Sequence, residues 1–439
     1  MTFASPRLLS AIAASLLSLA LAPRTPVAGG VTFHVARRAE ALATVTVRCD
    51  ACAWDTRGRE AVTLRLTLDD RYSQHLLVVR SGRAEYGVML GALEPGDHVL
   101  RLQPDRDLTA AMLGLDAAIV EDVAIEQLVE SSPNYLPVSL APIVHARPNT
   151  IGKFTDVPVF MWYETEPTPR GTRYRYSVIF TNEDGGTPTD RLMATWGRTT
   201  DIEYIYSVEV DASGRVLADD LQGPEHKILA FSGAREGRHP LLWVTTDNNM
   251  VEDRGTTNIR HAPVPVAFSL KDVSREAVMD ANPWLYRLAS EELIREGKIV
   301  QNAPPGQGTI PDPRQFVYIE ACGEVGDAAL AFEVGVRDTW VRSDRGVPQY
   351  TIVRDGCFRA AVPVNQAIGP ADLRGLRVAA YPRPTRDGIA AGPSPAIRFD
   401  RVNKMFMLDE RYVPGPSVLE WTGPAVVESG KALLIHIPH

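Results

Sequence analysis

Two acidic side chains, Asp201 and Glu203, stand two residues apart in the segment WGRTTDIEYIYSVEV, residues 196–210. The even positions from 202 to 210 are apolar or aromatic, which is typical of a strand with one buried face. Side chains two apart on a strand project from the same face, so the two carboxylates should lie side by side. Such a pair can ligate a cation or perform general acid–base chemistry. The alternative is the solvated face of a sheet.

Two further groups of polar side chains lie near the ends of predicted strands in the same part of the chain. The first group, in TNEDGGTPTD, contains Asn182, Glu183, Asp184 and Asp190. The second group, in TTDNNMVEDRGTTN, contains Asp247, Asn248, Asn249, Glu252 and Asp253. Because binding residues often sit in loops at strand ends, the groups could gather at one end of a sheet. The preference of Asp, Asn and Gly for turns is the alternative explanation.

An oxygen-only set of side chains is what hard cations require. The predicted ligands of such an ion, Ca²⁺ or Mg²⁺, are Asp201, Glu203 and Asp184. The predicted binding residues are Asn182, Glu183, Asp247 and Asn248. Glycosidases place their carboxylates on opposite sides of a sugar, so neighbours on one strand face suit metal ligation better.

Several signatures of catalysis and of nucleic-acid binding are absent from the sequence. The chain has no G-x-S-x-G, no H-E-x-x-H, no P-loop, and no G-x-G-x-x-G between a strand and a helix. The net charge is −8 and no long run of Lys or Arg occurs, so we expect no nucleic-acid partner. His226 or His239 could approach the acids, and Trp162, Trp196 and Trp243 could form a sugar platform or pack in the core.

The N-terminus has the pattern of an export signal. Arg7 is followed by the uncharged apolar run LLSAIAASLLSLALA, residues 8–22, which is short for a transmembrane helix. We predict a signal peptide over residues 1–29 and a secreted or periplasmic protein. No other apolar run is long enough to cross a bilayer, so we expect no transmembrane segment after signal removal.

The four cysteines fit an exported protein. Cys49 and Cys52 form a C-x-x-C, and Cys322 and Cys357 stand alone. A structural zinc site would need a second C-x-x-C or paired histidines, and neither is present. Oxidising conditions favour two disulfides, Cys49–Cys52 and Cys322–Cys357.

With 439 residues the chain should form several domains, and its patterning predicts a mainly β protein. We expect a central β-sandwich with a helical segment, flanked by two smaller β-sandwich (immunoglobulin-like) domains. The predicted parts are 30–104 (immunoglobulin-like sandwich), 105–134 (connector), 135–300 (central sandwich plus helix), 301–313 (linker) and 314–439 (C-terminal β domain).

The best helical pattern lies within residues 267–300. We predict that Asn282 caps the helix, Pro283 takes its first position and Gly297 ends it. The apolar stripe between them consists of Leu285, Leu288, Ala289 and Leu293.

GRTTDIE, followed by a hairpin with DASG, resembles a degenerate G-H-R-H-D-W-E heptapeptide of the necrosis- and ethylene-inducing-like proteins. The order LAPIVHARP, YRYSVIFTN, DIE and HPLLWVTTDNN over 140–255 is similar to the related vacuolar-sorting-protein-62-like family. The resemblance implies a sandwich fold and a divalent cation at Asp201 and Glu203. The family's two histidines fall on Arg198 and Thr200.

From these features we expect an exported, multidomain, β-rich binding protein of the cell envelope or extracellular space. Its partner would be a glycan or another envelope component, with Ca²⁺ or Mg²⁺ at the acidic site. The alternative is a secreted hydrolase that uses the clustered Asp and Glu of the central domain. Convergence of the three polar groups on one concave pocket would favour the hydrolase, and scattering over separate loops would count against it.

Overall fold

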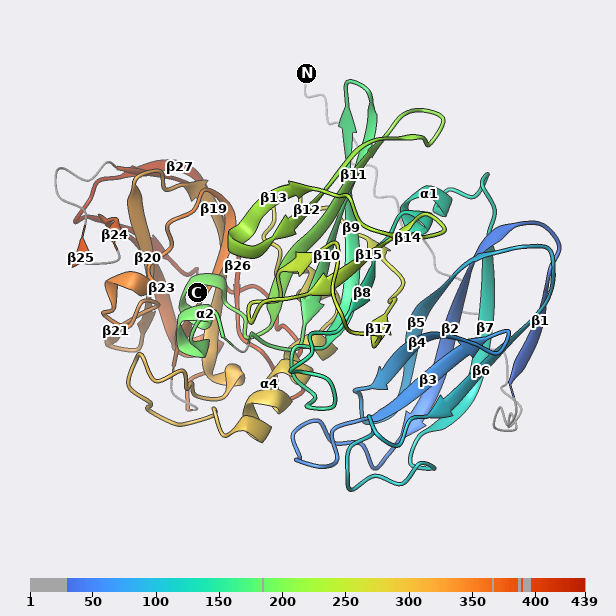
Figure 1. Cartoon of the computed structure of the whole chain (residues 1–439). Coiled ribbons are helices and arrows are strands. Elements are labelled where there is room, and N and C mark those ends of the chain that lie inside the picture. Colours follow the sequence, from blue (N-terminus) through green and yellow to red (C-terminus); the bar gives the residue numbers. More distant parts are fainter. Residues whose placement is uncertain (1–29, 184, 365–366, 386–387, 390–395, 439) are drawn as a thin grey trace, which may run out of the picture.

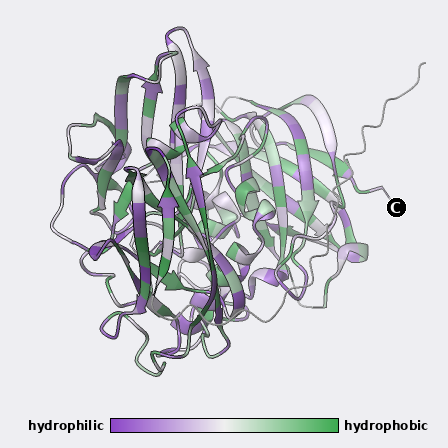
Figure 2. Ribbon diagram, turned by 90° about the vertical axis from the view of Figure 1, so that its right-hand side faces the viewer, coloured by the Kyte–Doolittle hydropathy of each residue, from purple (hydrophilic) through white to green (hydrophobic). Residues whose placement is uncertain are grey.

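Three β-rich parts follow one another along the chain, and each is built from strands packed in two layers (Figure 1). The prediction of a mainly β protein is confirmed. The computed structural model describes residues 30–183, 185–364, 367–385, 388–389 and 396–438. The predicted signal peptide (1–29) and the predicted ligand Asp184 lie outside these residues. Hydrophobic and hydrophilic residues alternate along many strands, so that one face of each sheet packs on a core (Figure 2).

The N-terminal sandwich, drawn in blue to teal in Figure 1, packs sheet β1-β6-β3-β4 against sheet β5-β2-β7. The bounds are β1 (Val31–Val35), β2 (Ala39–Cys49), β3 (Val62–Leu68), β4 (Arg71–Val78), β5 (Gly82–Leu93), β6 (Gly96–Pro104) and β7 (Ile119–Leu128). The segment 105–134, predicted as a connector, therefore supplies β7 to this sandwich. Trp54 and the Cys49–Cys52 disulfide lie in its apolar core.

The central part contains a six-stranded sheet, β13-β12-β11-β10-β9-β18, and a smaller sheet, β14-β15-β8-β17, with β16 beside β15. The larger sheet has the bounds β9 (Pro158–Thr168), β10 (Gly171–Phe180), β11 (Asp201–Val210), β12 (Val216–Gly223), β13 (Lys227–Ala230) and β18 (Val266–Ala267). The smaller sheet has the bounds β8 (Ile143–His145), β14 (Arg235–Glu236), β15 (His239–Val244), β16 (Val251–Glu252) and β17 (Arg260–His261). The predicted turn at 211–214 joins β11 to β12, with Gly214 at φ +77°.

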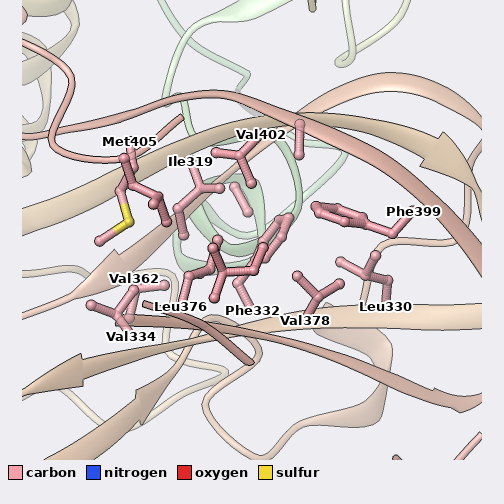
Figure 3. Close-up of a cluster of buried hydrophobic side chains, with 14 of the residues drawn as sticks. Ile319, Leu330, Phe332, Val334, Val362, Leu376, Val378, Phe399, Val402 and Met405 are labelled. Atoms are coloured by element: carbon pink, nitrogen blue, oxygen red, sulfur yellow. The ribbon is translucent and has the colours of Figure 1, made fainter. Parts of the chain in front are cut away.

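The C-terminal sandwich packs sheet β22-β19-β26-β27 against sheet β21-β20-β23-β28. The bounds are β19 (Phe316–Glu324), β20 (Ala328–Val336), β21 (Thr339–Arg342), β22 (Gly356–Pro363), β23 (Leu373–Pro382), β26 (Ile397–Phe406), β27 (Trp421–Val427) and β28 (Ala432–His436), with a short ribbon of β24 (Pro384–Thr385) and β25 (Gly388–Ile389). Between its two layers the side chains of Ile319, Phe332, Val378 and Phe399 pack together in the core (Figure 3). The predicted Cys322–Cys357 disulfide is confirmed and joins directly opposite residues of β19 and β22.

Helices in the described part of the chain are short, and three of the four α-helices lie between the sandwiches along the chain. The α-helices are α1 (Tyr135–Ser139), α2 (Thr189–Trp196), α3 (Ala277–Ala281) and α4 (Trp284–Glu296). The 3₁₀ turns are η1 (Pro224–His226), η2 (Pro313–Gln315), η3 (Pro348–Tyr350) and η4 (Pro370–Asp372). None of the helices in the described part of the chain has the length and apolar character needed to span a bilayer.

The prediction of a helix ending at Gly297 is confirmed, and all four residues of the predicted apolar stripe are buried. The predicted cap is wrong. Pro283 holds the N-cap position of α4, and the Asn282 side chain instead donates to the carbonyl of Val278. The side chain of Asn282 thus bonds back to α3, because only one residue separates α3 from the cap of α4. Helix α2 was not predicted from the sequence.

Candidate functional site

Strand β11 contains a β-bulge that interrupts the predicted alternation over 202–210. Its register against β10 shifts between Tyr204 and Tyr206, so that Ile205 is the extra residue. Ile202 packs with the cluster beneath α3 and α4, whereas Ile205 and Tyr206 pack between the two central sheets. The prediction of one continuous even-numbered apolar face is therefore wrong, because the bulge exchanges the two faces.

Asp201 and Glu203 nevertheless share one face, as predicted. They lie opposite Phe180 and Val178 of β10, and both of these side chains belong to the core between the central sheets. Directly paired residues point to the same side of a sheet. Asp201 is 1% exposed and Glu203 is 8% exposed. The alternative of a solvated sheet face is therefore wrong for this pair.

The two buried carboxyl groups are hydrogen-bonded to each other and to neutral amides. Asn249 Nδ2 donates to Asp201 Oδ2 over 3.0 Å, and Gln222 Nε2 donates to Glu203 Oε2 over 2.8 Å. Arg198 brings a positive charge to the pair, and its Nη1 lies 3.9 Å from Asp201 Oδ1. Arg198 also pairs with buried Glu276, so its charge is shared between two acids. Arg198 therefore offsets only part of the negative charge of the pair, which favours retention of a proton.

Burial and mutual repulsion raise the pKa of both acids. Burial raises the pKa of Asp201 to about 7, although the charge of Arg198 and the hydrogen bond from Asn249 oppose the shift. Burial, followed by the charge of Asp201, raises the pKa of Glu203 well above its ordinary value. The pair therefore holds a proton near neutral pH and can both donate and accept hydrogen bonds.

The pair forms part of the wall of a pocket of ≈ 540 Å³ at the end of β11. Residues that also line it are Glu183, Trp196, Gln222, His226, Asn248 and Arg275. Each of the three polar groups recognised in the sequence contributes at least one of these side chains. The backbones of the two loops approach closely here, since a Cβ on Gly186 would meet Asn248 Cβ at 3.0 Å.

Two of the predicted binding residues do not line this pocket. The Asp247 carboxylate pairs with Arg147, which also pairs with buried Asp156. Asn182 is buried, accepts a hydrogen bond from Thr155 and donates to Glu296. These contacts tie the loops to the rest of the central domain. Of the seven predicted ligand and binding residues, the structure brings four into the pocket: Asp201, Glu203, Glu183 and Asn248.

Two of the remaining acids of these loops, Asp190 and Asp253, have structural partners. Asp190 lies in the first turn of α2 and accepts hydrogen bonds from the Gly306 amide and the Tyr350 hydroxyl. Asp253 accepts from the amide and hydroxyl of Ser232. Their side chains hold loops and domains in place and do not reach the pair.

Of the histidines and tryptophans considered, two reach the pocket. His226 lies within 3.2 Å of Gln222, and Trp196 is half-buried in the lining. His239 instead pairs with Glu40 in the interface with the N-terminal sandwich. Trp162 is fully buried in the core. Among the described residues, one tryptophan, rather than a platform of three, therefore lines the pocket.

Sequence reasoning missed Gln222 and Arg275, and it did not select Asn249 from its group. Gln222 reaches Glu203 because β12 pairs with β11 in an antiparallel hairpin. Counting residue pairs outward from the turn at 211–214 would have placed Gln222 near the N-terminal end of β11. Arg275 comes from a segment far along the chain, and no local pattern identifies it.

No protein-family model matches the chain, and no curated protein matches it significantly. The resemblance of residues 140–255 to the necrosis- and ethylene-inducing-like and vacuolar-sorting-protein-62-like families therefore stays a prediction.

The oxygen donors only partly fit the cation that this resemblance implies. Asp201, Glu203 and Glu183 offer carboxylates, as hard cations require. Arg198 stands where that family has a histidine, and its guanidinium already faces Asp201. Among the described residues, no group of three or more His, Cys, Asp or Glu side chains is arranged to hold a metal ion. A cation at the pair would have to displace the shared proton.

Proposed function

We propose that this chain is an exported binding protein whose central sandwich takes a polar, hydroxyl-rich ligand of the glycan class. The observation that carries the proposal is a pocket in which hydrogen-bond donors and acceptors lie beside the ring of Trp196. Glycan hydroxyls both donate and accept hydrogen bonds, and the Asp201–Glu203 pair with Gln222 and Asn248 offers both functions. The half-buried ring of Trp196 adds an apolar surface for a sugar face.

Export is part of this proposal and has separate support. Two disulfides, as present here, are typical of proteins outside the reducing cytosol. The apolar segment within residues 1–29 has the composition of a signal peptide. N-terminal sequencing of protein recovered from the envelope or the medium should show that this segment has been removed.

A glycan array probed with the mature protein, followed by calorimetry on the best glycan, tests the binding site. Asp201→Asn combined with Glu203→Gln should weaken binding at least tenfold, because about 1.5–3 kcal/mol is associated with a hydrogen bond to a charged group. The matched control is Glu164→Gln combined with Glu166→Gln, two acids with the same spacing on β9 outside the pocket. Equal affinities for the wild type and the Asp201/Glu203 variant would place the ligand elsewhere.

The second candidate function is a hydrolase, which is favoured by the convergence of the three polar groups on one pocket and by the raised pKa of Asp201. A carboxyl group with a pKa of about 7 can act as a general acid or base at neutral pH. The two acids are neighbours on one strand face, so they act as a single proton-sharing unit, unlike the opposed carboxylates of glycosidases. Mass spectrometry of glycans incubated with the protein should reveal cleavage products. If no bound glycan yields cleavage products, the hydrolase candidate is excluded and glycan binding is the function that is left.

A further inference from the structure

The N-terminal and central sandwiches meet along a short β-pairing. The backbone N–H of Met89 on β5 donates to the carbonyl of Ala262, and the N–H of Val264 donates to the carbonyl of Gly87. Beside this pairing lies a second pocket, of ≈ 370 Å³, separate from the pocket at β11. Its volume lies in the range of small-molecule sites, which often occur at domain interfaces.

The lining of this interdomain pocket is mostly apolar and comes from both sandwiches. The β4–β5 hairpin forms one wall, β9 and the segment after β17 form another, and the first turn of α4 closes one side. The apolar side chains include Leu77, Val79, Val159, Phe160, Val264 and Trp284. Phe160 and Trp284 meet edge to face with ring centroids 6.5 Å apart. Such a lining favours an apolar ligand body over a sugar.

Arg80 places a positive charge in this apolar lining. Its guanidinium lies 4.7 Å from the ring centroid of Tyr86 and 4.9 Å from that of Trp284, and it donates to the carbonyl of Glu85. Within the described residues, no carboxylate forms an ion pair with Arg80, and its buried Nε has no hydrogen-bond partner. Glu85 belongs to the lining but is exposed, so solvent screens its charge. The charge of Arg80 is therefore open to an anion.

The inner end of the pocket carries no competing positive charge. Burial lowers the pKa of His261 to about 4, so its imidazole is neutral at pH 7. Its Nδ1 lies 3.0 Å from the carbonyl of His75, to which it donates. His75 is paired in turn with Tyr72 and Asp105. Arg80 is thus the lining group that would attract an anionic head.

We propose that the interdomain pocket binds a small apolar carboxylic acid. Its carboxylate pairs with Arg80, and its apolar body lies along Val159 and Phe160 of β9. A guanidinium holds a carboxylate through two parallel hydrogen bonds, and the aromatic rings on either side keep it in position. This site is independent of the pocket at β11, and its ligand differs in chemistry.

Calorimetric titration with octanoate and, in parallel, with 1-octanol tests the proposal on the mature protein. Octanoate should bind saturably and more tightly than octanol. Arg80→Gln should weaken octanoate binding roughly tenfold or more and leave octanol binding within about twofold, because only the charged hydrogen bonds are lost. Arg65→Gln is the matched control, since Arg65 also stacks on a tyrosine, Tyr72, but lies outside the pocket.

Two further variants separate the outcomes. Val159→Trp fills the pocket and should abolish the binding of both probes, and Asp201→Asn with Glu203→Gln should change neither. Equal affinity for octanoate and octanol would overturn the assignment of the acid group. Octanoate binding that survives both Arg80→Gln and Val159→Trp, or the absence of saturable octanoate binding to folded wild-type protein, would overturn the site itself.

Discussion

Asp201 and Glu203 are two buried carboxyl groups that share a hydrogen bond on one face of β11, and of the cations in the described part of the chain Arg198 alone forms an ion pair with Asp201. This relationship sets the chemistry of the pocket. Ionising both of two adjacent buried acids costs much free energy, so the pair retains a proton near neutral pH.

As the pH rises, the Asp201→Asn variant should lose less folding stability than the wild type. The folded-state pKa of Asp201 is about 7, above the ordinary value of 3.8 that applies to the unfolded chain. Between these values the folded state keeps a proton that the unfolded state has released, so stability falls as pH rises. Because Asn does not titrate, the wild type should lose about 4 kcal/mol more than the variant between about pH 4 and pH 7. Urea unfolding at several pH values measures this, and parallel profiles would contradict it.

At pH values above the pKa of the pair, Ca²⁺ or Mg²⁺ should raise the melting temperature of the protein. At lower pH values these cations should have little effect. A cation needs ionised ligands and must displace the shared proton. We therefore expect a response at about pH 8 and none at about pH 5, because only the folded state assembles the ligands. The Asp201→Asn, Glu203→Gln variant should lose the response, whereas the Glu164→Gln, Glu166→Gln control should keep it. An equal response in both variants would place the cation elsewhere.

Replacing Cys322 and Cys357 by Ala should destabilise the C-terminal sandwich by about 4 kcal/mol. The disulfide closes a loop with a sequence separation of 35 residues, and a loop of this length restricts the unfolded chain by about that amount. Denaturant unfolding of the oxidised double variant measures the loss. A decrease in the free energy of unfolding of less than about 1 kcal/mol would show that the unfolded chain is already compact without this disulfide.

Arg359→Met should destabilise the contact between the C-terminal sandwich and the helical segment. Arg359 is fully buried and pairs with Glu320 on β19 and Asp280 on α3. Removing one partner of a buried ion pair leaves uncompensated charge and costs about 3–5 kcal/mol. Arg398→Gln, at an exposed ion pair of the same sandwich, should cost about 0–1 kcal/mol. Similar losses in the two variants would contradict the role given to Arg359.

Local pattern in the sequence was sufficient for the strands, the main helix and the two disulfides. Period-two apolar patterning identifies a strand because successive side chains alternate between faces. The helix ends at Gly297 because glycine adopts the left-handed conformation, φ +71°, with little strain. Spacing on one strand was also enough to place Asp201 beside Glu203.

The tertiary structure alone decided the environment of that pair. The bulge at Ile205 preserves the position of the two acids and reverses the face of the residues after it, and nothing in the alternation signals it. The residues that bury the pair and line the pocket come from other elements and include Asn249, Gln222 and Arg275. Their packing determines the pKa of Asp201 and the shape of the pocket. The interdomain pocket likewise exists only where β5 meets the segment after β17. Local propensity acts over a few residues, whereas burial, charge and cavities arise from contacts between distant segments.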